Sequence, residues 1–77
     1  MDRLLNSFGS IVTELRHAAG LSQEALADRA GVHRTYVSQL ERGLKSPTLT
    51  VLFKLSDALA VRPSKLLLML ERAVDEL

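Results

Sequence analysis

Apolar side chains recur at spacings of three and four residues along most of the sequence, which is the period of an amphipathic helix. No segment alternates apolar and polar residues over more than a few positions, so the pattern predicts no strand. It divides the chain into five predicted helices, at about residues 7–19, 23–30, 34–42, 49–60 and 63–76. The sequence therefore predicts an all-α fold, a compact bundle of five short helices.

Residues with known preferences for helix ends mark the boundaries of these helices. Three glycines each follow a predicted helix, where a left-handed residue is often needed: Gly20, Gly31 and Gly43. Ser22 and Thr48 are of the types that cap helix N-termini. Pro63 fits the first position of the last helix, where a missing N–H costs nothing.

Residues 22–43 predict two helices joined by a short turn that contains Gly31. Ala27 is small where the two helices would cross, and Val37 and Leu40 would pack the second helix onto the first. The opposite face of the second helix has neither apolar nor acidic side chains; it consists of Arg34, Thr35, Ser38, Gln39 and Arg42. Two helices of this kind, the second held rigidly with one polar face free, are typical of a helix-turn-helix. Its second helix enters the major groove of DNA.

Several side chains on that face have the chemistry of base recognition. Arginine can bridge guanine O6 and N7, glutamine can pair with adenine, and a threonine methyl can touch the methyl of thymine. Arg34 and Thr35 lie in the first turn of the predicted helix, and Gln39 lies one turn later. We therefore expect these residues to read bases.

The distribution of charge agrees with a nucleic-acid partner. Residues 29–45 carry a net charge of +3, whereas the segments before and after them carry −2 and 0. A basic segment in an otherwise balanced domain is the footprint of a nucleic-acid binder. Arg42 and Lys45 lie where a phosphate backbone would run, and the free N–H groups at Ser22 and Gln23 would face another phosphate.

Length and composition exclude other classes. The 77 residues, with a net charge of +1, allow one domain, residues 1–77, and the absence of cysteine excludes disulfides and thiolate metal sites. No nucleophile, phosphate loop or paired carboxylate site points to an enzyme, so we predict no catalytic residue, cofactor or metal. The longest apolar run has five residues, short of the ~20 that span a bilayer. We expect no membrane partner and a cytoplasmic, nucleoid-associated protein.

Residues from about 8 to 61 resemble the Xre/Cro/repressor class of helix-turn-helix DNA-binding domains. The matching motifs are LR at 15–16, GLSQEALA at 20–27, AGV at 30–32, ERG at 41–43, SPT at 46–48 and ALAV at 58–61. The string HRTYVSQLERG at 33–43 is similar to the recognition helix of the controller proteins of bacterial restriction–modification systems. The resemblance implies a fold of the lambda-repressor type and a small dimer that binds a palindromic operator.

The resemblance also implies roles for matching positions. Base contacts would come from Arg34, Thr35, Ser38 and Gln39, and backbone contacts from Ser22, Gln23, Tyr36, Arg42, Lys45, Ser46 and Thr48. Tyr36 fits core packing as well as it fits a DNA contact. Arg16 and Glu41 would form a partly buried ion pair between the first and third helices. Two positions depart from the family pattern: Ala25 leaves the capping box of Ser22 incomplete, and Arg62 replaces the usual cap before Pro63.

The last predicted helix, at about residues 63–76, has an unusually broad apolar stripe. One interpretation is that the whole stripe covers the core. The interpretation we favour is that part of it forms a twofold dimer interface, because so wide a stripe needs burial on more than one side. The expected interface residues are Leu66, Leu67, Leu70, Ala73, Val74 and Leu77. A dimer would place two recognition helices one DNA turn apart, ~34 Å.

Three functions remain open on the sequence. The first is a dimeric regulator of transcription of the controller type, for which RNA polymerase would be a further partner. The second is a generic Xre-family repressor with the same fold. The third is an antitoxin-like interaction protein that binds its partner through the last helix.

Overall fold

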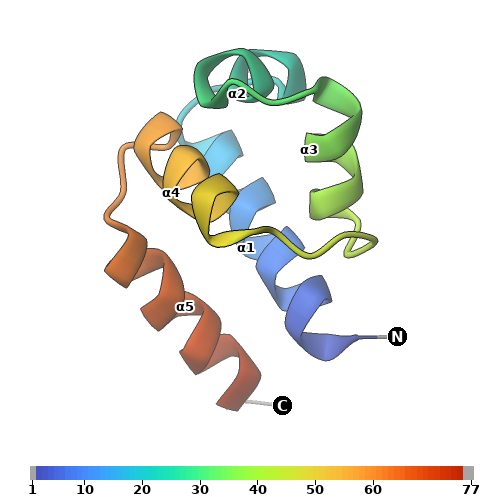
Figure 1. Ribbon diagram of the computed structural model, residues 1–77. Helices are drawn as coiled ribbons and strands as arrows, with labels where there is room; N and C mark the ends of the chain where they lie inside the picture. The colour runs from blue at the N-terminus through green and yellow to red at the C-terminus, as the bar shows by residue number, and fades with distance from the viewer. Residues whose placement is uncertain (1, 76–77) are drawn as a thin grey trace.

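Five helices make up most of residues 2–75, the part of the chain that the computed structural model describes (Figure 1). They are α1 (Arg3–Ala18), α2 (Gln23–Ala30), α3 (Arg34–Glu41), α4 (Leu49–Ala58) and α5 (Pro63–Asp75). No strand occurs in this part of the chain. The predicted all-α, five-helix fold is confirmed.

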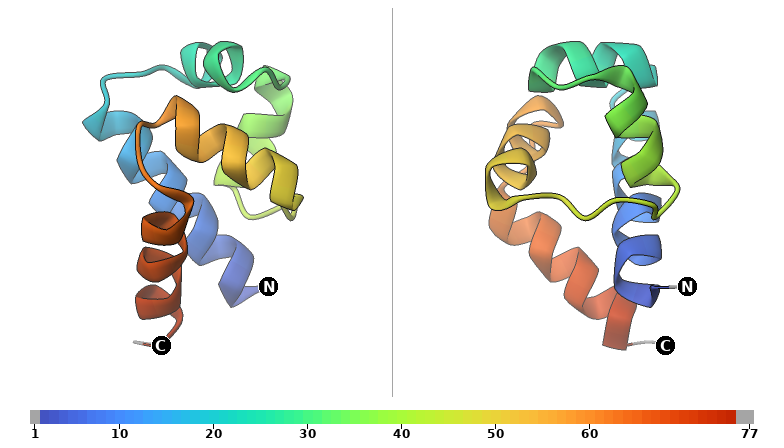
Figure 2. Two further views of the ribbon diagram at one scale, coloured as in Figure 1. Left: turned by 60° about the vertical axis from the view of Figure 1, so that its left-hand side comes forward. Right: turned by 45° about the vertical axis from the view of Figure 1, so that its right-hand side comes forward.

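The five helices form a closed series of contacts. The helix α1 packs against α3 on one side and α5 on the other, α2 packs against α3 and α4, and α4 also packs against α5. The views in Figure 2 show α2 across one end of the molecule and both chain termini toward the other. The segment between α3 and α4 runs along the outside as an extended loop, which leaves it open to a partner.

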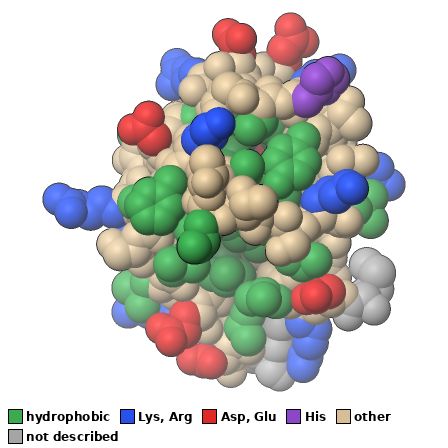
Figure 3. All heavy atoms as spheres, in the orientation of Figure 1, with side chains coloured by type: hydrophobic (Ala, Val, Ile, Leu, Met, Phe, Trp, Pro, Cys, Tyr) green, Lys and Arg blue, Asp and Glu red, His purple; other side chains and the backbone are tan. Residues whose placement is uncertain are grey.

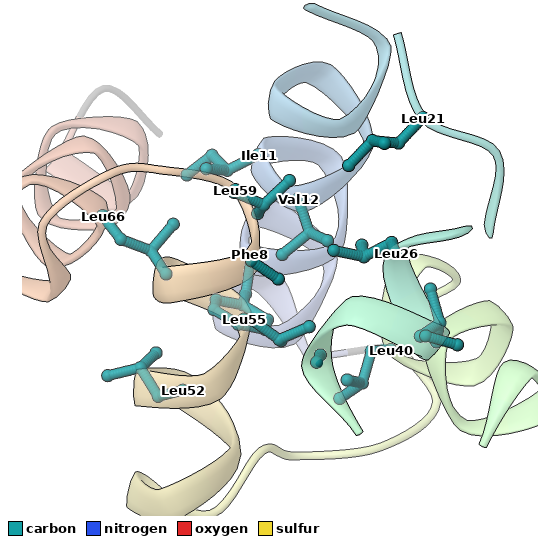
Figure 4. Packing of buried hydrophobic residues seen from close by; sticks show 14 residues of the cluster. Phe8, Ile11, Val12, Leu21, Leu26, Leu40, Leu52, Leu55, Leu59 and Leu66 are labelled. Carbon is teal, nitrogen blue, oxygen red and sulfur yellow. The ribbon is translucent and has the colours of Figure 1, made fainter. Parts of the chain in front are cut away.

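The core forms where the inward faces of all five helices meet (Figure 4). Phe8 and Val12 of α1 lie at its centre, among Leu26 of α2 and Leu55 of α4. The buried apolar residues are Phe8, Ile11, Val12, Leu21, Leu26, Ala27, Ala30, Val37, Leu40, Leu52, Leu55, Ala58, Leu59 and Leu66. Burying each large side chain of this kind stabilises the fold by roughly 1.5–3 kcal/mol, so these contacts fix the relative positions of the helices.

Side-chain caps fix the starts of four helices. The Ser22 and Thr48 hydroxyls accept hydrogen bonds from the backbone N–H groups of residues 25 and 51, at 3.0 and 3.1 Å. The predicted caps at these two positions are confirmed, and the Ser22 cap forms although Ala25 leaves the capping box incomplete. At α3 the cap is His33, whose Nδ1 accepts from the Thr35 N–H at 3.4 Å.

The first helix begins earlier than predicted. It starts at Arg3 rather than near residue 7, because the Asp2 carboxylate accepts a hydrogen bond from the Leu5 N–H at 3.1 Å and caps it there. This extra turn carries Leu4, which is 49% exposed and lines a groove together with Leu67 and Leu68 of α5.

Four helices end in one type of turn, α2 among them with its left-handed Gly31. A residue just past the helix is left-handed, and its N–H and that of the next residue bond back to carbonyls of the last turn. Gly20 and Gly43 take this position after α1 and α3, with φ of 71° and 75°. After α4 it is taken by Ala60, with φ 57°. The left-handed turn ends α4 at Ala58, two residues before the predicted end.

Candidate nucleic-acid interface

A three-residue turn positions α3 against α2. Gly31 is left-handed, with φ 69°, and the Val32 N–H donates to the Ala27 carbonyl at 3.0 Å. Val37 and Leu40 of α3 have no exposed surface, so the inward face of the helix is held by the core. The predicted helix-turn-helix is therefore present, with its second helix rigidly fixed.

A close backbone contact fixes the far end of α3. At Gly9 of α1 an added Cβ would lie 2.5 Å from the Glu41 carbonyl oxygen and 2.6 Å from that of Leu40. Only glycine allows the two helices to approach this closely. The outward face of α3 is consequently oriented by α2 at one end and by α1 at the other.

The predicted base-reading residues lie on the outward face of α3. Arg34 and Thr35 are exposed, and Ser38 and Gln39 are half-buried. Tyr36 is also half-buried and packs against the core, which leaves only part of its ring for another contact. In Figure 3 Lys and Arg side chains lie at the right, on the side of α3, as well as at the left and centre of the view, and acidic side chains lie above, at the left and in the lower half.

The predicted phosphate contacts lie on both sides of α3. Arg42, Lys45 and Ser46 are exposed along the loop that follows the helix. The hydroxyls of Ser22 and Thr48 are also on exposed residues, and each accepts a capping hydrogen bond. A hydroxyl that accepts one bond keeps its own hydrogen to donate to a phosphate.

An ion pair joins α1 to the end of α3, as predicted. The Arg16 Nε and Nη2 atoms donate to the two carboxylate oxygens of Glu41 at 2.7 and 3.0 Å. The Arg16 Nη1 atom donates to the Leu21 carbonyl at 2.9 Å. The side chains of Arg16 and Glu41 are only 11% and 5% exposed. Loss of either partner would therefore leave a nearly buried charge without compensation.

The pair also receives a hydrogen bond that the sequence did not indicate. Gln23 Nε2 donates to Glu41 Oε1 at 3.0 Å, across 18 positions of sequence. Burial of Glu41 acts to raise its pKa. Hydrogen bonds from Arg16 and Gln23 and the charge of Arg16 outweigh that effect, so the pKa of this carboxyl lies below its ordinary value.

The last helix contributes to the core and to the surface. Leu66 was expected in a dimer interface, but that prediction is wrong, because Leu66 has no exposed surface and points into the core (Figure 4). Leu70 and Ala73 are half-buried and pack against the core. Leu67 and Val74 are 47% and 36% exposed, and Leu77 lies outside the described residues.

An apolar surface extends beyond the predicted stripe. We define it by five residues of α1, α4 and α5 that are exposed and line two adjoining grooves: Leu4, Leu49, Leu67, Leu68 and Val74. Leu49 is 76% exposed, the largest fraction among these five. Neither Leu4 nor Leu49 was expected here. Their exposure depends on where α1 begins and how α4 packs, which the helical period of the sequence leaves open.

Neither a metal-holding cluster nor a membrane-spanning helix is found among residues 2–75. No group of three or more His, Cys, Asp or Glu side chains in this range could hold a metal ion. None of the helices described here has the length and apolar character needed to cross a membrane.

Comparison with known proteins agrees with this geometry. Residues 12–66 match the model of a helix-turn-helix family. The chain is 43% identical to the control protein C.BamHI of Bacillus amyloliquefaciens over 61 residues, which are 78% of this chain and 75% of the relative. It is likewise 43% identical to the control protein C.SmaI of Serratia marcescens over 56 residues, 73% of this chain and 67% of the relative.

Solved structures give the same result over more of the chain. The restriction–modification controller protein C.AhdI from Aeromonas hydrophila is 45% identical, with a TM-score of 0.79 over 80% of this chain and 94% of its own. The controller protein C.Esp1396I is 27% identical, with a TM-score of 0.87 over 96% and 97%. These relatives are regulators rather than enzymes. The chain therefore belongs to the Xre-type helix-turn-helix family of DNA-binding transcriptional regulators and is similar to the restriction–modification controller proteins.

Proposed function

We propose that this protein is a restriction–modification controller that binds an inverted-repeat operator in double-stranded DNA as a homodimer. The observation that carries the proposal is the outward face of α3. It combines exposed Arg34 and Thr35 with half-buried Ser38 and Gln39, and no acidic side chain interrupts it. The similarity to several controller proteins supports this subtype over a generic Xre-family repressor.

In the proposed complex the start of α3 lies deepest in the major groove. Arg34 donates to guanine, Gln39 pairs with adenine, and Thr35 and Ser38 contact neighbouring base edges. These side chains stand on a helix that is fixed at both ends. DNA binding therefore does not have to order the backbone that carries them.

Phosphate contacts on both sides of this face would fix the position of α3 along the DNA. Their proposed sources are Ser22 and Gln23 at the start of α2, Tyr36 within α3, and Arg42, Lys45, Ser46 and Thr48 beyond it. Such contacts supply affinity for any sequence, whereas base contacts supply discrimination.

The apolar surface is the proposed dimer interface. Five exposed apolar side chains around two grooves form a contiguous patch of the kind that marks interaction sites. It includes Leu67 and Val74 of the expected set and replaces the buried Leu66 with Leu4, Leu49 and Leu68. The twofold symmetry of an inverted-repeat site favours a second copy of this chain as the occupant.

The regulator would act in the cytoplasm on the nucleoid, and RNA polymerase would be its partner at promoters that it activates.

The apolar surface also suits a second candidate function, an antitoxin-like protein that binds a different chain there. A purified protein that stays monomeric at high concentration would favour that second function.

The proposal is tested by comparing two arginine substitutions on a selected duplex and on mixed-sequence DNA. Arg34→Ala should cost roughly 1–3 kcal/mol on the selected duplex and little on mixed DNA. Arg42→Ala should weaken both and lower the salt slope by about one. Lys54→Ala, an exposed cation of α4 outside the interface, is the control and should change neither. Equal losses on both DNAs for Arg34→Ala would contradict its base-reading role.

A further inference from the structure

The bond from Gln23 to Glu41 connects a proposed phosphate contact to the interior of the protein. Gln23 is the first residue of α2, and its Nε2 lies 3.0 Å from the Glu41 Oε1. Two other proposed phosphate contacts, Ser22 and Thr48, accept hydrogen bonds through their hydroxyls from N–H groups of the helices that they cap. Gln23 is thus tied to a different helix from its own.

Glu41 is itself held firmly. Its side chain is 5% exposed, and Arg16 donates to both carboxylate oxygens, at 2.7 and 3.0 Å. Arg16 is anchored in turn by its bond to the Leu21 carbonyl. A glutamine that donates to so fixed an acceptor has little rotamer freedom left.

The geometry leaves Gln23 able to bind an anion. A carboxamide nitrogen has two hydrogens, and the bond to Glu41 uses one of them. The second remains, near the start of α2, where the Ser22 hydroxyl already accepts from the N–H of residue 25 and the N–H groups of residues 23 and 24 have no partner within the helix. A bare carboxylate here would repel a phosphate, but the Arg16 guanidinium neutralises it.

We propose that Glu41 is a positioning residue for DNA binding: it orients the Gln23 side chain toward a phosphate, while Arg16 cancels its charge. The inference rests on the proposed function. The ion pair between α1 and α3 then affects DNA affinity, through Gln23, as well as the stability of the fold. Ordering a free glutamine side chain would otherwise weaken binding by about three- to tenfold.

A double-mutant cycle on DNA affinity tests this coupling. The four proteins are the wild type, Gln23→Ala, Glu41→Gln and the double variant, titrated with a synthetic duplex of mixed sequence at low salt. We expect each single variant to lose about three- to tenfold in affinity. Gln23→Ala should leave the salt slope unchanged, because a neutral amide releases no counterion when it binds a phosphate. We expect the double variant to bind no more weakly than Gln23→Ala. Independent, multiplying losses would overturn the proposal, because a purely structural Glu41 would act equally in both backgrounds.

A control variant separates a change in DNA affinity from a loss of folding stability. Ile11→Val removes a methylene group from the core of α1 without touching the network, and should leave DNA affinity unchanged while the protein is folded. Arg42→Ala reports on the proposed function separately. If Arg42→Ala weakens binding but the cycle is additive, only the positioning role of Glu41 is wrong. If the folded wild type does not bind DNA, both proposals are wrong.

Nuclear magnetic resonance of the wild type gives a test that needs no variant. The two side-chain amide protons of Gln23 should have well-separated shifts and restricted motion in the free protein. On adding the duplex, the proton that does not face Glu41 should shift more. A side-chain amide of Gln23 that is as mobile as those of unstructured peptides would overturn the proposal.

Discussion

Replacing Gly9 with alanine tests how α1 positions the recognition helix. In an ordinary helix the change would stabilise the protein by about 0.5–1 kcal/mol, because glycine loses more backbone entropy on folding. Here the new Cβ would lie 2.5 and 2.6 Å from two backbone carbonyl oxygens of α3. Backbone atoms cannot rotate away as a side-chain end can, so α3 has to move.

The size of the effect follows from that contact. Overpacking a well-packed site costs typically about 1–3 kcal/mol, which exceeds the gain in helix propensity. Movement of α3 also disturbs the ion pair of Arg16 with Glu41, whose shorter contact is 2.7 Å. We therefore expect Gly9→Ala to destabilise the protein by about 1–2 kcal/mol and to weaken DNA binding.

Urea unfolding followed by circular dichroism measures this change. Ser10→Ala is the matched control, because it adds an alanine to the exposed face of the same helix and should be neutral or slightly stabilising. A Gly9→Ala protein as stable as the wild type, or more stable, would refute the close approach of α1 and α3.

Three further predictions concern other parts of the molecule. Ala60→Gly should raise the free energy of unfolding by about 0.5–1 kcal/mol, because it relieves a left-handed alanine; thermal melting checks this, and a lower melting temperature would contradict it. Because the pKa of Glu41 is lowered in the folded protein, its carboxylate stabilises the fold fully above the ordinary value of 4.5, and this contribution is lost as the pH falls through the lowered value. Unfolding at neutral and acidic pH should therefore show a smaller loss of stability with acid in Glu41→Gln than in the wild type. Leu68→Asp should halve the sedimentation mass, whereas Leu44→Asp, exposed outside the apolar surface, should not; an unchanged mass for Leu68→Asp would argue against the interface.

Local signals in the sequence predicted most of the fold. The period of apolar residues and the glycines at 20, 31 and 43 placed α2 and α3 within a residue of their observed bounds. Ser22 and Thr48 were recognisable as caps because their preference is intrinsic to the side chain. The outward face of α3 was predictable for the same reason, since a rigid helix separates its faces by spacing alone.

Features that depend on distant packing were not predictable in this way. The broad apolar stripe of α5 does not reveal which side meets the core, so Leu66 was assigned to the surface although α1 and α4 bury it. The start of α1 was missed because its cap, Asp2, precedes a turn with a weak apolar pattern. The hydrogen bond from Gln23 to Glu41 joins two helices across 18 positions of sequence. A local sequence pattern does not indicate which side chains come together over that separation.

Selection from a random double-stranded DNA library at physiological salt, followed by sequencing of the enriched pool, would show whether the outward face of α3 reads bases. A dimeric regulator should enrich an inverted repeat with half-sites about one helical turn apart, and this enrichment should be lost with Arg34→Ala. A folded protein that enriches no sequence would contradict a base-reading role for α3, and the apolar surface would then become the site to investigate.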